Sequence, residues 1–66
     1  MSVAKIVELT STSPDSFEEA CRQGIAKASE TIRNIRSAWV DGQEVIVEGG
    51  QITGYHVHLK VTFLVE

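Results

Sequence analysis

Two histidines stand two residues apart in the stretch TGYHVHLK, residues 53–60. In an extended strand successive side chains point to opposite faces, so His56 and His58 are expected to share one face. Such a pair can give two imidazoles to one metal ion, but a zinc site needs about three or four protein ligands. Either histidine can instead exchange a hydrogen bond with a ligand, lie at an interface or be solvated, because an imidazole both donates and accepts.

The histidines belong to the second of two expected strands, residues 36–48 and 51–66. Between them stands the pair Gly49-Gly50, which suits the positive φ angles of a tight hairpin turn. The sequence therefore predicts an antiparallel hairpin.

Counting back from the turn gives the register of this hairpin. It places Asp41 opposite His58 and Gln43 opposite His56, on a face that Trp39 shares. Asp41 is therefore the expected third member of a possible metal site with His56 and His58. Both strands agree on which face is apolar, and a slip by one residue would spoil that agreement.

The first half of the chain predicts a strand followed by a helix. Residues 3–10 are rich in β-branched and aliphatic side chains, which favour a strand. Ser13 is the expected N-cap, with Pro14 at the first helical position. Apolar and small residues then recur at helical spacing from Phe17 to Ile35, so the helix is expected to reach the latter.

The order of these elements predicts an α+β fold of the β-α-β-β type. Residues 1–66 are expected to form one domain, a three-stranded antiparallel sheet with the helix packed on one face. Gly24, in mid-helix, costs about 1 kcal/mol against alanine, so it is expected to permit close approach to the sheet. One helix cannot cover both faces, so Trp39 on the free face is expected to be covered by another subunit or by a ligand.

Composition narrows the function. A chain of 66 residues buries only about 60% of its unfolded surface, and its single cysteine, Cys21, cannot close an internal disulfide, so oligomerisation is expected. The net charge of −3 without a basic cluster argues against a nucleic-acid partner. No signal-peptide core or membrane-spanning run is apparent, which favours a soluble cytoplasmic protein without a membrane partner. No nucleophile with a base and no phosphate-binding glycine loop is found, so an enzyme is not expected.

The sequence resembles the dodecin family over nearly its whole length. The resemblance is carried by VEL in the first strand, TSPDSFEEA at the helix start, AKA in mid-helix, the helix end from Thr31 to Ile35, and the closing Val61-x-Phe63-x-Val65-Glu66. It implies a hollow shell of twelve identical subunits that binds flavins.

In flavin-binding dodecins a tryptophan of the second strand stacks on the isoalloxazine ring, and a glutamine of the third strand hydrogen-bonds the ring. Those positions fall on Ser37 and His56 here, and Trp39 lies two residues beyond Ser37 on the same face. The resemblance thus implies sequestration of FMN or riboflavin at Ser37, Trp39 and His56, and the hairpin register adds Gln43 beside His56 as a further polar contact. The alternative is a flavin-free structural or storage shell that binds a metal ion or another small planar ligand.

Overall fold

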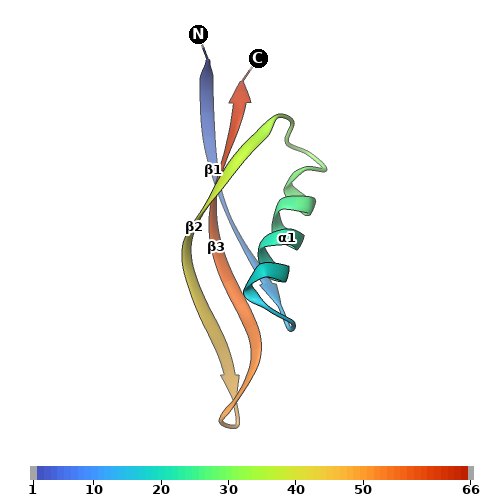
Figure 1. Ribbon diagram of the computed structural model, residues 1–66, viewed down its shortest axis with the longest axis vertical. Coiled ribbons are helices and arrows are strands. Elements are labelled where there is room, and N and C mark those ends of the chain that lie inside the picture. Colours follow the sequence, from blue (N-terminus) through green and yellow to red (C-terminus); the bar gives the residue numbers. More distant parts are fainter. Residues whose placement is uncertain (1, 66) are drawn as a thin grey trace.

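The computed structural model describes residues 2–65, and Glu66 at the end of the last expected strand lies outside them. The elements are β1 (Val3–Ser13), α1 (Phe17–Ala28), β2 (Ile35–Glu48) and β3 (Gln51–Val65). The three strands form one antiparallel sheet in the order β1-β3-β2, with β3 in the middle (Figure 1). The predicted α+β fold of the β-α-β-β type is confirmed.

The helix α1 packs on one face of the sheet and leaves the other face bare (Figure 1). The hydrophobic core lies between them and consists of Ala20 from α1 and the alternate residues Val57, Leu59 and Val61 of β3. Because alternate residues of a strand share a face, the intervening His56, His58 and Lys60 point to the bare face. The shared face of the two histidines is therefore as expected from the sequence.

The helix begins three residues later than expected. Ser16, in an extended conformation, is the N-cap, and its hydroxyl accepts a hydrogen bond of 2.9 Å from the amide of Glu19. Ser13 instead ends β1, where it is fully buried opposite Tyr55 and accepts from the amide of Asp15. The prediction of Ser13 as the N-cap was wrong because β1 continues for three residues beyond the β-branched run.

The helix also ends earlier than expected, at Ala28. The amide of Ser29 donates to the carbonyl of Ile25 at 2.9 Å, and Asn34 then takes a left-handed conformation with φ of 62°. Asparagine is among the few residues that adopt this conformation readily. Ile35 consequently begins β2, so the expectation of a helix reaching Ile35 was wrong.

Gly24 lies where α1 comes closest to the sheet. A Cβ atom there would meet Ser11 Cβ at 3.1 Å and the Cδ1 atoms of Leu9 and Leu59 at 3.3 Å. Contacts this short are tighter than packed side chains normally make, so a larger residue would push helix and sheet apart. The packing role expected for Gly24 is therefore confirmed.

The β2–β3 hairpin has the expected register beside the turn and again from Ser37 to Val40, with register shifts at Ile35/Ser37, Val40/Gly42 and Ile46/Val47. Glu48 pairs with Gln51 beside the turn, and Trp39 pairs with Lys60 at the far end. Both turn glycines have positive φ, 58° and 77°, as the turn requires. Between Val40 and Gly42 the register shifts by one residue, which makes Asp41 the extra residue of a β-bulge.

Much of the hairpin has no helix against it. The molecule measures 51 × 19 × 13 Å, and the turn end of the hairpin extends beyond α1 (Figure 1). Every described residue of β2 after Ile35 is exposed. Its large apolar side chains are Trp39, Val40, Val45, Ile46 and Val47, with exposed fractions from 39% to 72%.

Candidate functional site

The candidate functional side chains lie on the bare face of the sheet. Rows of side chains cross it from strand to strand, because residues paired between strands point to the same face. From β1 to β2 the rows are Ile6, Thr62 and Ser37; Glu8, Lys60 and Trp39; Thr10, His58 and Gly42; and Thr12, His56 and Glu44. The face thus combines carboxylates, imidazoles, an ammonium group and an indole.

Three of these side chains, one from each strand, converge into what we call the carboxylate–imidazole cluster: Glu8, Asp41 and His58. Each offers one ligand atom, and the three atoms lie within 4.8 Å of one another. His58 stands between the carboxylates, with Nδ1 3.2 Å from Asp41 Oδ2 and Nε2 3.6 Å from Glu8 Oε1. The cluster is open to solvent, since the exposed fractions are 37% for His58, 36% for Asp41 and 59% for Glu8.

A cation already lies beside the cluster. Lys60 Nζ is 3.8 Å from Asp41 Oδ2, so the Asp41 carboxylate is shared between an imidazole and an ammonium group. Glu8 pairs with Lys60 between β1 and β3, but its nearest nitrogen partner in the cluster is His58. Among the ion pairs found in residues 2–65, Glu8 contacts only His58, whereas Asp41 contacts both His58 and Lys60. The carboxylate of Glu8 therefore has fewer charged partners than that of Asp41.

His56 does not join the cluster. Its Nδ1 lies 2.8 Å from the hydroxyl of Thr12, and its partner across the hairpin is Glu44. Of the three residues of the possible metal site considered from the sequence, His58 and Asp41 do meet, whereas His56 lies outside the cluster and Glu8 is its third member.

The predicted pairings of Gln43 with His56 and of Asp41 with His58 were wrong, since Glu44 pairs with His56 and Gly42 pairs with His58. A register shift between Ile46 and Val47, on the turn side of Gln43, moves the pairing by one residue, so Gln43 pairs with Val57, whose side chain faces the helix. Gln43 still borders a hollow of about 280 Å³ with His56, His58, Thr10, Gly42 and Glu44. The role of Gln43 as a polar contact for a flavin stays a prediction, without support from the register on which it was based.

Trp39 lies on the bare face with 72% of its surface exposed. It borders an open groove of about 330 Å³ together with Ile6, Asp41, Lys60 and Thr62. Ser37 is on the same face, one row from Trp39, where it pairs with Thr62. The groove therefore adjoins the cluster, and Asp41 belongs to both.

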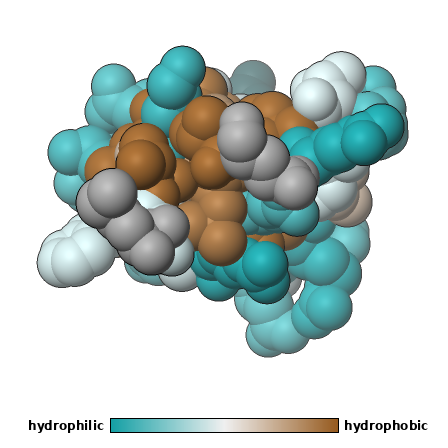
Figure 2. All heavy atoms as spheres, turned by 90° about the horizontal axis from the view of Figure 1, so that it is seen from above, coloured by the Kyte–Doolittle hydropathy of each residue, from teal (hydrophilic) through white to brown (hydrophobic). Residues whose placement is uncertain are grey.

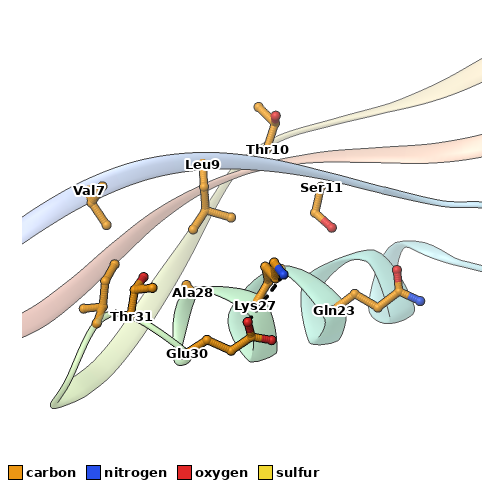
Figure 3. A pocket seen from close by; sticks show the side chains of 11 residues that line it. Val7, Leu9, Thr10, Ser11, Gln23, Lys27, Ala28, Glu30 and Thr31 are labelled. Carbon is orange, nitrogen blue, oxygen red and sulfur yellow. Dashed lines mark ion pairs between the residues drawn. The ribbon is translucent and has the colours of Figure 1, made fainter.

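A larger hollow lies elsewhere, between β1 and the second half of α1, and measures about 650 Å³. Figure 3 shows Val7, Leu9 and Ser11 pointing from β1 toward the helix, while Thr10 points to the opposite side. Lys27 and Glu30 form an ion pair of 3.4 Å at its edge (Figure 3). None of the site residues expected from the sequence borders this hollow.

One end of the molecule is also apolar. Figure 2 looks along the long axis at the end with the termini, where hydrophobic residues gather in the centre within a polar rim. Val3 pairs with Val65 there, and both are exposed.

None of the described helices is long and apolar enough to cross a membrane.

The sequence alone did not identify Glu8. The hairpin register could be counted from Gly49-Gly50, but no turn joins β1 to β3, so their register had no such marker. The structure places Glu8 opposite Lys60, one row from His58. Glu8 is the one acidic residue of β1, and this was the signal that could have drawn attention to it.

Comparison with known proteins gives one consistent result. The family model described as Dodecin matches residues 3–66. The chain is 38% identical over 64 residues to a protein named calcium dodecin from Mycobacterium tuberculosis, covering 96% of this chain and 89% of that one.

Solved structures agree with this result. The dodecin from Streptomyces coelicolor superimposes with a TM-score of 0.93 at 31% identity, covering 98% of this chain and 93% of that one. A calcium dodecin from Mycobacterium tuberculosis, described as calcium chelating and as having a novel calcium-binding site, superimposes with a TM-score of 0.84 at 30% identity, covering 97% and 91%.

Proposed function

Because this chain belongs to the dodecin family, we propose that it is a binding protein assembled from identical subunits, rather than an enzyme, and that it holds a divalent cation on the bare face of its sheet. The observation that carries the proposal is the carboxylate–imidazole cluster, in which Glu8, Asp41 and His58 bring one ligand atom each within 4.8 Å of the others. A relative at 38% identity is named for calcium.

The residues of the cluster suit a cation. Two carboxylates supply negative charge, and the imidazole supplies a neutral nitrogen donor. Three elements far apart in the sequence hold these groups, so the folded sheet brings the donors together before an ion arrives. Partial exposure lets an ion enter from solvent, while the bulge at Asp41 turns its carboxylate toward His58.

Assembly into an oligomer is supported by the exposed apolar surface. Exposed fractions are 63% for Ile6, 72% for Trp39, 56% for Val47 and 55% for Ile52. These side chains lie on both β1 and the β2–β3 hairpin, so one small ligand cannot cover them all. A shell of twelve copies, the form implied by the family resemblance, would cover them with further copies of the same chain.

Flavin binding is the second candidate, and the observation that favours it is the exposed indole of Trp39 beside an open groove. An aromatic ring stacked on an indole gains about 0.5–1.5 kcal/mol beyond the burial of its area. In this candidate FMN or riboflavin stacks on Trp39, and His56 supplies a polar contact. The exposed Trp39 stands one row away from Ser37, the position that corresponds to the stacking tryptophan of flavin-binding dodecins.

The cation proposal is tested by following thermal unfolding while adding divalent cations. Protein is first dialysed against a chelator, and Ca²⁺, Mg²⁺, Mn²⁺ and Zn²⁺ are then added separately. At least one of them is expected to raise the melting temperature with saturation, because an ion that binds only the folded state stabilises it. If none does so in the unmodified protein, the cation proposal is wrong.

A further inference from the structure

The further inference rests on the proposed function and names the ion. We propose that the carboxylate–imidazole cluster selects a transition-metal ion of the zinc class rather than calcium, with His58 and Glu8 as direct ligands and Asp41 as a positioning residue. The imidazole of His58 has two nitrogens that face two different carboxylates.

The two contacts of His58 differ in kind. The 3.2 Å between Nδ1 and Asp41 Oδ2 is an ion-pair contact, and a small rotation of the side chains would let Nδ1–H donate a hydrogen bond to this carboxylate. The 3.6 Å between Nε2 and Glu8 Oε1 is too long for a hydrogen bond. With the proton on Nδ1, Nε2 is left as a free lone pair directed at the Glu8 side of the cluster.

The longer gap has the size that a metal ion needs. Two ligands about 2.1 Å from a tetrahedral ion lie about 3.4 Å apart. The observed 3.6 Å between Nε2 and Oε1 is close to that separation, so an ion can sit between His58 and Glu8 with little movement of either side chain. Zinc accepts both imidazole nitrogen and carboxylate oxygen at such distances.

Asp41 then has the role of a carboxylate behind a metal-bound histidine. Such a carboxylate accepts the second ring N–H, fixes the tautomer and strengthens the imidazole as a ligand. Asp41 is less suited to bind the ion directly, because Lys60 Nζ lies 3.8 Å from the same oxygen that faces His58. The bulge places this carboxylate at Nδ1.

Calcium fits these donors poorly. It takes six to eight oxygen ligands at about 2.3–2.6 Å, whereas imidazole suits zinc, copper and nickel. The cluster offers two carboxylates, one of them already shared with Lys60, and its third donor is a nitrogen. Two relatives of this chain are named for calcium. The ligand atoms that the cluster of this chain offers differ from those that calcium requires.

One subunit supplies two direct ligands, and a tetrahedral ion takes four. The cluster lies on the bare face with Glu8 59% and His58 37% exposed, so water or the same pair from a second copy can complete the shell. Whether water or a second copy supplies the remaining ligands, the affinity for the ion still depends on Glu8 and His58, and the experiment measures this affinity.

The test is calorimetric titration of the full chain, freed of metal by chelation, with Zn²⁺ and with Ca²⁺. Zn²⁺ is expected to bind at least about 100-fold more tightly than Ca²⁺, because the nitrogen ligand favours it. Glu8→Gln and His58→Gln are each expected to lower the Zn²⁺ affinity at least about tenfold. Glu44→Gln is the matched control, since it removes a carboxylate from the same face outside the cluster, and it is expected to change the affinity less than about threefold.

The positioning role of Asp41 has its own readout. Asp41→Asn keeps an oxygen that accepts from Nδ1–H, so it is expected to retain at least about threefold more Zn²⁺ affinity than Asp41→Ala. X-ray absorption of the zinc-loaded protein is expected to show imidazole scattering that His58→Gln removes.

The outcomes separate the two proposals. If Ca²⁺ binds as tightly as Zn²⁺, or if His58→Gln leaves Zn²⁺ binding unchanged, the inference about the ion is overturned while a cation-binding function stands. If Glu44→Gln costs as much as Glu8→Gln, the ion does not sit in the cluster, and the inference is also overturned. If no divalent ion binds, both proposals fall.

Discussion

Asp41 Oδ2 lies 3.2 Å from His58 Nδ1 although the two residues are not paired across the hairpin: Gly42 is the partner of His58. The contact exists because the bulge adds one residue to β2 and turns it toward β3. A local irregularity of the sheet thereby brings a carboxylate to an imidazole.

Asp41→Ala is expected to affect binding far more than stability. The contacts of Asp41 with His58 and Lys60 are exposed by about a third or more, and exposed ion pairs contribute at most about 1 kcal/mol. The free energy of unfolding, measured in urea, should fall by less than that amount, while cation affinity falls at least about tenfold. A large loss of stability with unchanged affinity would make Asp41 a structural residue only.

Saturation with the bound ion is expected to stabilise the fold. At a free concentration about 100 times the dissociation constant, an ion that binds only the folded state adds about 2.7 kcal/mol. The melting temperature of the wild-type protein should therefore rise with added Zn²⁺ and fall again with excess chelator. The same additions to Glu8→Gln should give a clearly smaller rise, and an equal rise would place the stabilising ion elsewhere.

Flavin binding is expected to quench flavin fluorescence if Trp39 is a stacking platform. Trp39→Ala should abolish the quenching, whereas Trp39→Phe should keep part of it, because a smaller ring still stacks. Titration of FMN and of riboflavin with protein measures both. Unchanged emission at high concentrations of the unmodified protein would remove this candidate.

The two histidines are expected to contribute unequally to flavin binding. His56→Ala should weaken it at least about fivefold, since losing a hydrogen-bond partner in a desolvated site costs about 1–3 kcal/mol. His58→Ala should weaken it less than about threefold, because its partners are the carboxylates of the cluster. The fluorescence titration compares the two variants after light scattering has shown both to be assembled. Equal losses would indicate a joint role of the pair.

Gly24→Val is expected to destabilise the protein by about 1–3 kcal/mol, because the new side chain would press on Leu9, Ser11 and Leu59. Ala26→Val is the matched control: it puts the same residue into the same helix at an exposed position. Urea unfolding of both variants at one protein concentration isolates the packing contribution. A Gly24→Val variant as stable as the wild-type protein would mean that the close approach does not restrict this position.

Light scattering is expected to give a mass far above that of the 7.2 kDa chain. The apolar residues left exposed on β2 and on β1 are the reason, since a small monomer rarely leaves so many uncovered. Twelve copies is the expected number. A monomer at micromolar concentration would contradict the assembly.

Local patterns predicted most of the fold. Alternation in β3 identified the core residues Val57, Leu59 and Val61, and Gly49-Gly50 located the turn and the register near it. The helix limits were less predictable, because apolar spacing at Ile32 and Ile35 is compatible with a helix or with the start of a strand. The hydrogen bonds that end α1 and the left-handed Asn34 decide between them.

The site was predicted only in part, for two physical reasons. A bulge changes the partner of every residue between it and the next irregularity, so the position of Gln43 could not be counted from the turn. Glu8 lies near His58 because β1 pairs with β3. The helix α1 and the strand β2 separate these two strands in the sequence. Non-local pairing of this kind leaves no periodic signature in either strand.

Trp39 has a practical consequence because it is the single tryptophan of the chain. Its indole is largely exposed, and it shares the groove with Asp41, which belongs to the carboxylate–imidazole cluster, and with Lys60, which lies beside that cluster. The intrinsic emission of the protein therefore comes chiefly from one known place. A change in its wavelength or intensity reports the state of the bare face without any attached dye, whether that face is filled by an ion, a planar ligand or another subunit.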